Sequence, residues 1–211
     1  MTISSPTLAL AREYAAAGLP VIPLHPSSKR PTDTAWPDKA TLDADLITAI
    51  WRGDDPRGIG VVGGHTLDAG GYLTILDIDE HDLAASGTEA LHDLGVTLGA
   101  LPATYTVLTP TGGRHLYYRT AAKLTNAAGS NLPAGIDIRG AGGFVVAPPS
   151  IHPDGGAYEQ DLGSPPADKL AQLPAVWEEQ LARTPDRTPK TPATPTVLAI
   201  GIADTVQPAT G

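Results

Sequence analysis

Two aspartates stand two residues apart at the end of an apolar segment, YLTILDID, which ends with Asp77 and Asp79. Side chains two apart on a strand point to the same face, so these carboxylates project together. They repel each other, and a divalent cation would relieve that repulsion. Oxygen ligands favour Mg²⁺ or Mn²⁺ over zinc. The alternative is a strand that simply ends in a polar turn, with Asp82 capping the next helix.

A glycine turn precedes the second polar group, in the segment TPTGGRHLYY at 109–118. Gly113 allows a tight, hairpin-like turn and a close approach of the backbone to a ligand. His115 follows this turn and is well placed to donate a hydrogen bond to a phosphate. We count Gly113 and Arg114 with it as candidate nucleotide contacts. The alternative is a structural histidine that is hydrogen-bonded inside the sheet.

The segment GIDIRG contains a third polar pair, Asp137 and Arg139, again two residues apart on an apolar strand. Asp137 could complete a carboxylate cluster with the first pair. Arg139 could clamp a phosphate or balance the acids. The alternative is a local ion pair on an exposed surface, which contributes about 0–1 kcal/mol.

Two loops carry further candidates. Lys29 and Arg30, with Trp36 nearby, suit contact with phosphate and base, and a solvated loop is the equally good alternative. Ser150 and His152, in the rigid segment PPSIH, could touch substrate, although a structural turn explains them as well. We keep Lys29, Ser150 and His152 as candidate nucleotide-binding residues.

Helical signals occur in four places. Ser5 can cap a first helix that has Pro6 at its first position and Gly18 just past its end. Thr41 can cap a second, with an apolar face formed by Leu42, Leu46, Ile47 and Ile50. A third helix is predicted over 81–96, weakened by Gly87, and a closing helix over 166–183.

Short apolar segments bounded by glycine and proline turns predict strands at 19–24, 58–64, 72–79, 104–110, 114–120, 135–140 and 143–150. The pattern indicates an α+β domain whose sheet is mostly antiparallel in its second half. We assign residues 1–183 to this domain. Residues 184–211 are rich in proline and threonine and predict a disordered tail or linker, in which VLAIGIA could dock on a partner or on the body.

Composition excludes several classes of site. The chain has no cysteine, which rules out disulfides and zinc sites built from thiolates. No nucleophile elbow, P-loop or helical HExxH motif is found. The net charge of −9 speaks against simple electrostatic binding of DNA, although a local basic groove can exist on an acidic body. Without a signal peptide or an apolar stretch of about 18 residues, we expect a soluble, cytoplasmic protein with no membrane partner.

In their order, these motifs resemble the bifunctional primase-polymerase N-terminal domain of plasmid, phage and prophage replication proteins, a branch of the archaeo-eukaryotic primase superfamily. The matching segments within 8–158 are GLPVIPL, SKRP, LDID, TPTGGRHLYY and GIDIRGAGGFVVAPPSIHPDGGAY. The resemblance implies a two-lobed catalytic domain with an RRM-like second lobe and an active site between the lobes. It also implies that Asp77, Asp79 and Asp137 hold catalytic Mg²⁺ or Mn²⁺ and that His115 binds the incoming triphosphate.

The function expected on this basis is template-directed nucleotidyl transfer by a DNA primase-polymerase. Its partners would be nucleoside triphosphates and a single-stranded or primed DNA template, with a replicative helicase as a further candidate. A non-catalytic module that binds nucleic acid or nucleotide within a replication or defence assembly is the alternative. A metal-dependent phosphohydrolase is a weaker third reading.

Overall fold

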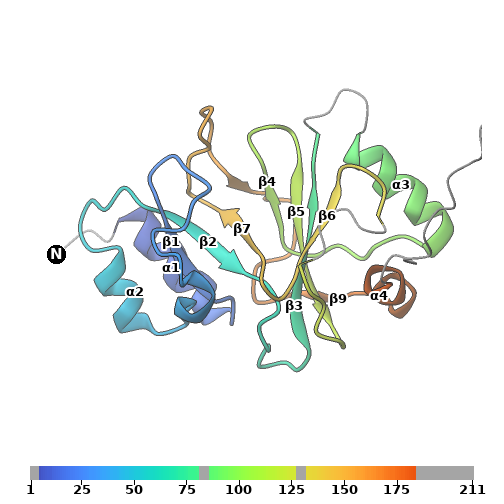
Figure 1. The fold of residues 1–211 in the computed structure, drawn as a ribbon, viewed down its shortest axis with the longest axis horizontal. Coiled ribbons are helices and arrows are strands. Elements are labelled where there is room, and N and C mark those ends of the chain that lie inside the picture. The colour runs from blue at the N-terminus through green and yellow to red at the C-terminus, as the bar shows by residue number, and fades with distance from the viewer. Residues whose placement is uncertain (1–4, 81–85, 127–131, 184–211) are drawn as a thin grey trace, which may run out of the picture.

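The computed structural model describes residues 5–80, 86–126 and 132–183. Two sheets lie between two pairs of helices, with α1 and α2 on one side and α3 and α4 on the other (Figure 1). All strand pairs are antiparallel except one, so the predicted α+β class with mostly antiparallel sheets is confirmed. No helix in these ranges is long and apolar enough to cross a membrane. The predicted tail, 184–211, lies outside the described residues.

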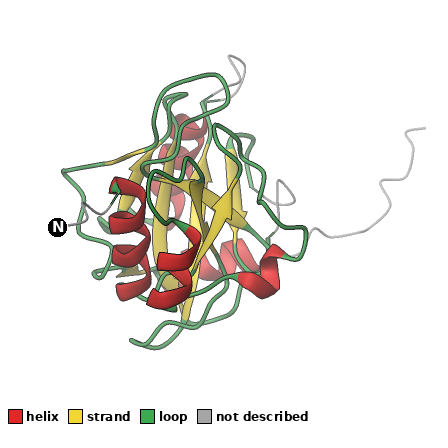
Figure 2. Cartoon of the chain, turned by 90° about the vertical axis from the view of Figure 1, so that its left-hand side faces the viewer, coloured by secondary structure: helices red, strands yellow, loops and turns green. Residues whose placement is uncertain are grey.

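The first lobe contains a small sheet of three strands in the order β1-β2-β7. Its strands and helices are α1 (Pro6–Ala16), β1 (Val21–Leu24), the 3-10 helix η1 (Trp36–Lys39), α2 (Ala44–Ile50), β2 (Gly58–Val62) and β7 (Phe144–Ala147). Seen from this end, α1 and α2 lie in front of the strands (Figure 2). The Arg12 guanidinium on α1 donates to the Thr48 hydroxyl on α2 at 2.6 Å.

Both helices of this lobe begin at a side-chain cap. The Ser5 hydroxyl accepts a hydrogen bond from the Leu8 main chain, and Pro6 takes the first position of α1, as predicted. In α2 the prediction was wrong by two residues, because Asp43 and not Thr41 is the cap. The Asp43 carboxylate accepts from two main-chain N–H groups of the first turn, and the negative charge suits a helix N-terminus.

The apolar face of α2 also differs from the predicted one. Ile47 is fully buried, whereas Leu42 and Leu46 are 37% and 55% exposed. The seven residues of α2 make only about two turns. One residue per turn is then enough to contact the core, and the fully buried Trp51 directly after the helix fills the next place. The predicted apolar face is therefore confirmed for Ile47 and Ile50, which contact the core, and wrong for Leu42 and Leu46.

The second lobe contains a large sheet of six strands in the order β6-β3-β5-β4-β8, with β9 paired in parallel to β5. Its elements are β3 (Tyr72–Ile78), α3 (Gly87–Leu98), β4 (Thr106–Leu108), β5 (Arg114–Thr120), β6 (Ile136–Arg139), β8 (Glu159–Gln160), β9 (Ala171–Gln172) and α4 (Ala175–Ala182). The succession β3-α3-β4-β5 is the first part of the β-α-β-β-α-β arrangement. In the sheet, β3 lies between β5 and β6, so the strand that carries Asp77 is next to the two strands that carry the other polar motifs.

Two predicted helices have different bounds in the structure. The Ser86 side chain caps α3 by accepting from the Glu89 main chain, so Gly87 stands at the first position and not inside the helix. The predicted cap Asp82 and residues 81–85 lie outside the described residues. The closing helix is shorter than predicted, since residues 166–174 form turns and β9 before α4 begins.

The strands of the large sheet separate two apolar cores. Ile75 and Tyr117 point towards the first lobe and belong to the larger core. Leu76, Tyr118 and Ile138 point the other way and pack against α3 and α4. The strict alternation of the strands thus determines which side chains reach the space between the lobes.

Candidate active site

Asp77 lies on the central strand β3, where the register pairs it with His115 on β5 and with Asp137 on β6. Residues paired across antiparallel strands point to the same face, so the three side chains form a row across the sheet. Asp77 is 8% exposed and His115 is 5% exposed, whereas Asp137 on the outer strand is half-buried. Three separate sequence motifs therefore meet on the face towards the first lobe.

Asp79 completes a cluster of carboxylates just beyond the end of β3. Its main chain is held on both sides, because its N–H donates to the Gly135 carbonyl at 2.8 Å and its carbonyl accepts from Gly87 at 3.0 Å. One carboxylate oxygen each of Asp77, Asp79 and Asp137 lie within 4.8 Å of one another. A donor set made only of oxygen fits a hard divalent cation such as Mg²⁺ or Mn²⁺.

Arg139 bridges two members of this cluster. Its Nε and Nη2 donate to Asp77 Oδ2 at 3.1 and 2.9 Å, and Nη2 also donates to Asp137 Oδ2 at 2.9 Å. The predicted alternation is confirmed, since Ile136 and Ile138 pack in the core on the opposite face. The ion pair is not an isolated surface contact, because the guanidinium offsets the repulsion between two partly buried carboxylates.

His115 meets the carboxylates from the other side of the row, with its Nε2 at 3.4 Å from Asp77 Oδ1. Burial lowers the pKa of His115 below its ordinary value of 6.5, because an imidazolium would lose its hydration. The Asp77 carboxylate opposes this lowering, while Arg139 and Lys29 add to it. His115 is therefore a neutral imidazole at neutral pH.

A cavity of about 260 Å³ brings these groups together between the lobes. The three-strand face supplies Asp77, Asp79, His115 and Arg139, and the first lobe supplies Lys29 and residues 144–146 of β7. Lys29 is otherwise exposed, in the loop after β1. The cavity thus combines acids that can hold metal with cations that can attract a negatively charged ligand.

The turn between β4 and β5 closes one side of the cavity. At Gly113 a Cβ would lie 2.3 Å from the Ile78 carbonyl, so any larger residue would push the turn away from β3. Gly113 therefore acts through this close backbone approach. Arg114 is exposed on the opposite face from His115, where its charge acts on Glu80, and the structure does not bring it to the cavity.

The loop that follows β7 places its two candidates differently. The Ser150 hydroxyl accepts from the Ile59 N–H at 2.8 Å and donates to the Ile59 carbonyl at 3.3 Å, which ties the loop to β2 and not to the cavity. His152 is buried and contacts the ring of Tyr158, which lines the cavity. Trp36 packs edge-to-face on Phe144, with ring centroids 4.9 Å apart, and so supports the cavity wall.

Several residues that line the cavity were not among the site residues predicted from the sequence. Thr109 and Thr111 line it from the β4–β5 turn, with their hydroxyls 3.1 Å apart. Their position two apart before the glycines was a usable signal. Phe144 and Tyr158 offered none, because an aromatic residue in a strand or after a turn is most simply read as core.

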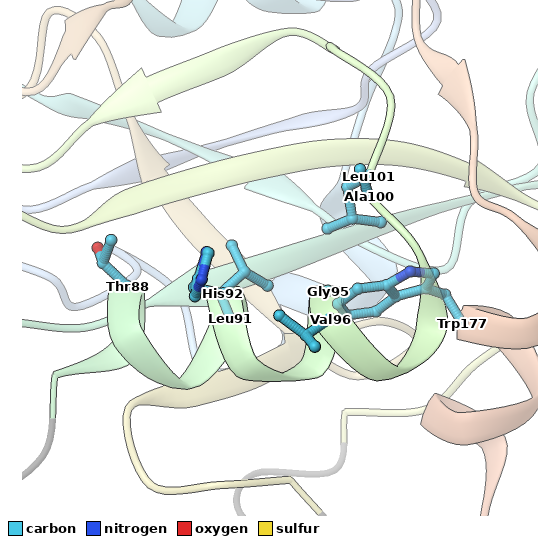
Figure 3. Close-up of a pocket in the computed structure, with 8 residues that line it drawn as sticks. All are labelled: Thr88, Leu91, His92, Gly95, Val96, Ala100, Leu101 and Trp177. Atoms are coloured by element: carbon cyan, nitrogen blue, oxygen red, sulfur yellow. The ribbon is translucent and has the colours of Figure 1, made fainter.

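A larger cavity, of about 410 Å³, lies on the far side of the second lobe. Figure 3 shows it between α3 and Trp177 of α4, with Leu91, Val96 and Leu101 around it. It contains no acidic side chain and none of the residues predicted to do chemistry. The smaller cavity is therefore the candidate active site.

The α+β fold with mostly antiparallel sheets is that expected of a primase-like catalytic domain. The family of bifunctional DNA primase/polymerase N-terminal domains matches residues 11–176, which include every residue that lines the cavity. The chain belongs to this family, whose members are nucleotidyltransferase-type enzymes with nucleotide and DNA substrates. None of the curated proteins matches the chain.

Proposed function

We propose that this domain adds nucleotides to a DNA strand opposite a DNA template, with Mg²⁺ or Mn²⁺ held by Asp77, Asp79 and Asp137. The observation that carries the proposal is a cluster of three carboxylates, two of which (Asp77 and Asp79) line one cavity together with a histidine, an arginine and a lysine, in a chain of this family. The proposed catalytic domain comprises residues 1–183. A replication setting in a plasmid, phage or prophage, a helicase partner and a cytoplasmic location are proposed from the sequence and the family alone.

Asp77, Asp79 and Asp137 would hold the metal, which would supply activation of the attacking 3′-oxygen and stabilisation of the charge on the leaving pyrophosphate. The positively charged side chains of the cavity have a different role, which is to bind the triphosphate. Lys29 and Arg139 flank the cavity and attract the triphosphate, which positions it for transfer. Arg139 also keeps Asp77 and Asp137 in a fixed geometry through its planar fork of donors.

His115 contributes a hydrogen-bond donor without a full charge. Because burial keeps its imidazole neutral, the ring does not repel cations held by the neighbouring Asp77. A neutral imidazole still donates one hydrogen bond, which suits a contact with a phosphate oxygen. Such a contact with the triphosphate supports nucleotide binding, while the carboxylates supply all the ligands to metal.

The net charge of −9 favours a second candidate, a module that binds nucleotide without catalysis. One experiment separates the two. The full chain is incubated with labelled nucleotides, Mg²⁺ or Mn²⁺, and either a primed or an unprimed single-stranded template. Extension of the primer indicates a polymerase, products on the unprimed template indicate a primase, and binding without incorporation indicates the inert module.

Asp79→Asn gives the matched test of the metal cluster. The variant should incorporate no nucleotide and should keep the melting temperature of the unaltered chain. Asp93→Asn, the same substitution at an exposed position on α3, is the control and should remain active. Full incorporation by Asp79→Asn would show that the cluster does not carry the chemistry.

A further inference from the structure

The ring of His115 is oriented by packing more than by hydrogen bonds. Its Nε2 lies 3.4 Å from the nearest Asp77 oxygen, longer than an ordinary N–H···O bond. Its Nδ1 is buried and has no hydrogen-bond partner of ordinary geometry among the described residues. The main chain of Val146 acts on the ring as well, but its effect on the pKa of His115 is smaller than those of burial and of the neighbouring charges. The Tyr158 ring stacks on the His115 ring, with centroids 5.8 Å apart and planes inclined by 27°.

Tyr158 is itself enclosed. It is 3% exposed, and its ring contacts His152 at a centroid distance of 6.0 Å. His152 is 5% exposed, and its Nδ1 accepts a hydrogen bond from the Asp154 main chain at 3.1 Å. We call the three rings of His115, Tyr158 and His152 the aromatic stack. It runs from the carboxylates into the loop after β7.

The outer part of this stack is attached to the first lobe. The Tyr158 N–H donates to the Ser150 carbonyl at 2.9 Å, and the Ser150 hydroxyl is bonded to the main chain of Ile59 on β2. His115, in contrast, belongs to β5 of the second lobe. Tyr158 also directly precedes β8, which pairs with β4 of the second lobe. The contact between Tyr158 and His115 therefore lies where the two lobes meet, at the edge of the cavity.

We propose that Tyr158 is a positioning residue, whose ring fixes the orientation of the His115 imidazole towards the nucleotide, and that His152 braces Tyr158. The proposal rests on the proposed function, in which His115 contacts the triphosphate. Aromatic pairs of this kind contribute modestly beyond the area that they bury. Removing the Tyr158 ring should therefore weaken nucleotide binding about three- to tenfold.

The test compares Tyr158→Leu with Tyr158→Phe in the full chain. The probe is a fluorescent deoxynucleoside triphosphate with Mn²⁺, and its dissociation constant is measured. Tyr158→Leu should bind three- to tenfold more weakly, and Tyr158→Phe, which keeps the ring, should restore the affinity. Tyr118→Leu is the matched control, because Tyr118 is equally buried on the opposite face of the sheet. It should lower the melting temperature without changing the affinity.

A second readout needs no nucleotide and no activity. The NMR signals of the His115 ring protons can be assigned by their loss in His115→Gln. In the unaltered chain and in Tyr158→Phe, the ring current at position 158 should move the chemical shifts of these protons away from ordinary values. In Tyr158→Leu these chemical shifts should return to the values that are usual for histidine. His152→Leu should produce a smaller change in the same direction.

The two readouts distinguish the failures. An unaltered chain that binds no triphosphate overturns the proposed function, and the NMR signals then still decide whether Tyr158 orients His115. Unchanged His115 signals in Tyr158→Leu overturn the positioning role. Equal loss of affinity in Tyr158→Phe and Tyr158→Leu also overturns it, because the hydroxyl and not the ring would then act.

Discussion

On the large sheet, neighbouring residues of the same strand point to opposite faces and have different roles. Towards α3 and α4, Leu76 and Ile138 are buried among apolar side chains. Towards the first lobe, Ile75 also lies in an apolar core, but the alternate positions nearer the cavity hold Asp77, Asp137 and Arg139. Apolar burial stabilises the fold, whereas buried polar groups reduce stability unless their partners compensate for lost hydration.

The unpartnered polar atoms follow the same division. In the described ranges, the buried side-chain nitrogens and oxygens without a hydrogen-bond partner are His115 Nδ1, Tyr117 OH and His152 Nε2. His115 and Tyr117 point to the face of the first lobe, and His152 belongs to the aromatic stack. Local departures from good packing rules are expected at functional sites. The polar residues of the site thus lower the stability of the fold. Substitutions there should reduce activity more than stability, and substitutions in the apolar core should do the reverse.

The largest effect is expected on the polar face, from Asp77→Asn. Incorporation should fall at least about 1,000-fold, because the central member of the metal cluster is lost. The melting temperature should change by only a few degrees, since Arg139 keeps Asp137 as a partner and one of three like charges is removed. Incorporation assays and thermal melts check both. Activity close to that of the unaltered chain would contradict the catalytic assignment.

The adjacent residue should behave in the opposite way. Leu76→Ala removes a fully buried side chain and should cost about 2–5 kcal/mol of unfolding free energy. At this chain length the melting temperature should fall by roughly 5–15 °C. Below that temperature the variant should retain most of its activity. A folded Leu76→Ala protein that cannot incorporate nucleotides would show that the two faces are coupled.

Arg139→Lys should have a smaller effect on activity, about tenfold, because a lysine cannot reproduce the forked contact with Asp77 and Asp137. Arg119→Lys is the control. Arg119 lies on the same face of β5 as His115 but at the other end of the strand, where it donates to Gln172 and to the Ala69 carbonyl and does not line the cavity. Equal losses in both variants would mean that the effect is one of stability alone.

His115→Ala should weaken triphosphate binding by about tenfold and should leave metal binding much less affected, because oxygen ligands satisfy the cation. Titration with Mn²⁺ alone and with nucleotide plus Mn²⁺ separates the two affinities. Equal loss of both would place His115 among the metal ligands.

The smallest effect is expected from removal of residues 184–211. A chain that ends at Arg183 should be as stable and as active as the full chain, because the composition of the removed segment offers little apolar surface to bury. Thermal melts and incorporation assays check this. A large drop in melting temperature would show that the segment docks on the body, with VLAIGIA as the first place to look.

Local periodicity was enough to find the acids of the site. The spacing of two in LDID and GIDIRG correctly places Asp77 beside Asp79 and Asp137 beside Arg139. Which strands lie next to each other is a long-range property that no local pattern contains. The pairing of β6 with β3, across more than 50 residues of chain, is what brings Asp137 to Asp77. The family resemblance supplied this step, and the residues alone did not.

Short elements were predicted less well, because a few contacts decide them. Thr41 and Asp43 are both good caps, and only the tertiary position of Ile47 selects the second. The predicted closing helix contained Pro174, which interrupts a helix, and the structure begins α4 only after it. The part before this proline pairs with β5 through Ala171 and Gln172 instead. Tyr158 is recognisable as part of the site only once two lobes are seen to meet at its ring.

The origin of β7 has a consequence for synthesis. This strand completes the small sheet by pairing with β2, although its residues follow the central strands of the other lobe. A chain leaving the ribosome exposes β2 as an edge strand until residue 147 has emerged, and such edges invite pairing with other chains. Fragments that end before Phe144 should therefore associate with one another. The cavity cannot form before β7 is in place, because residues 144–146 supply part of its wall.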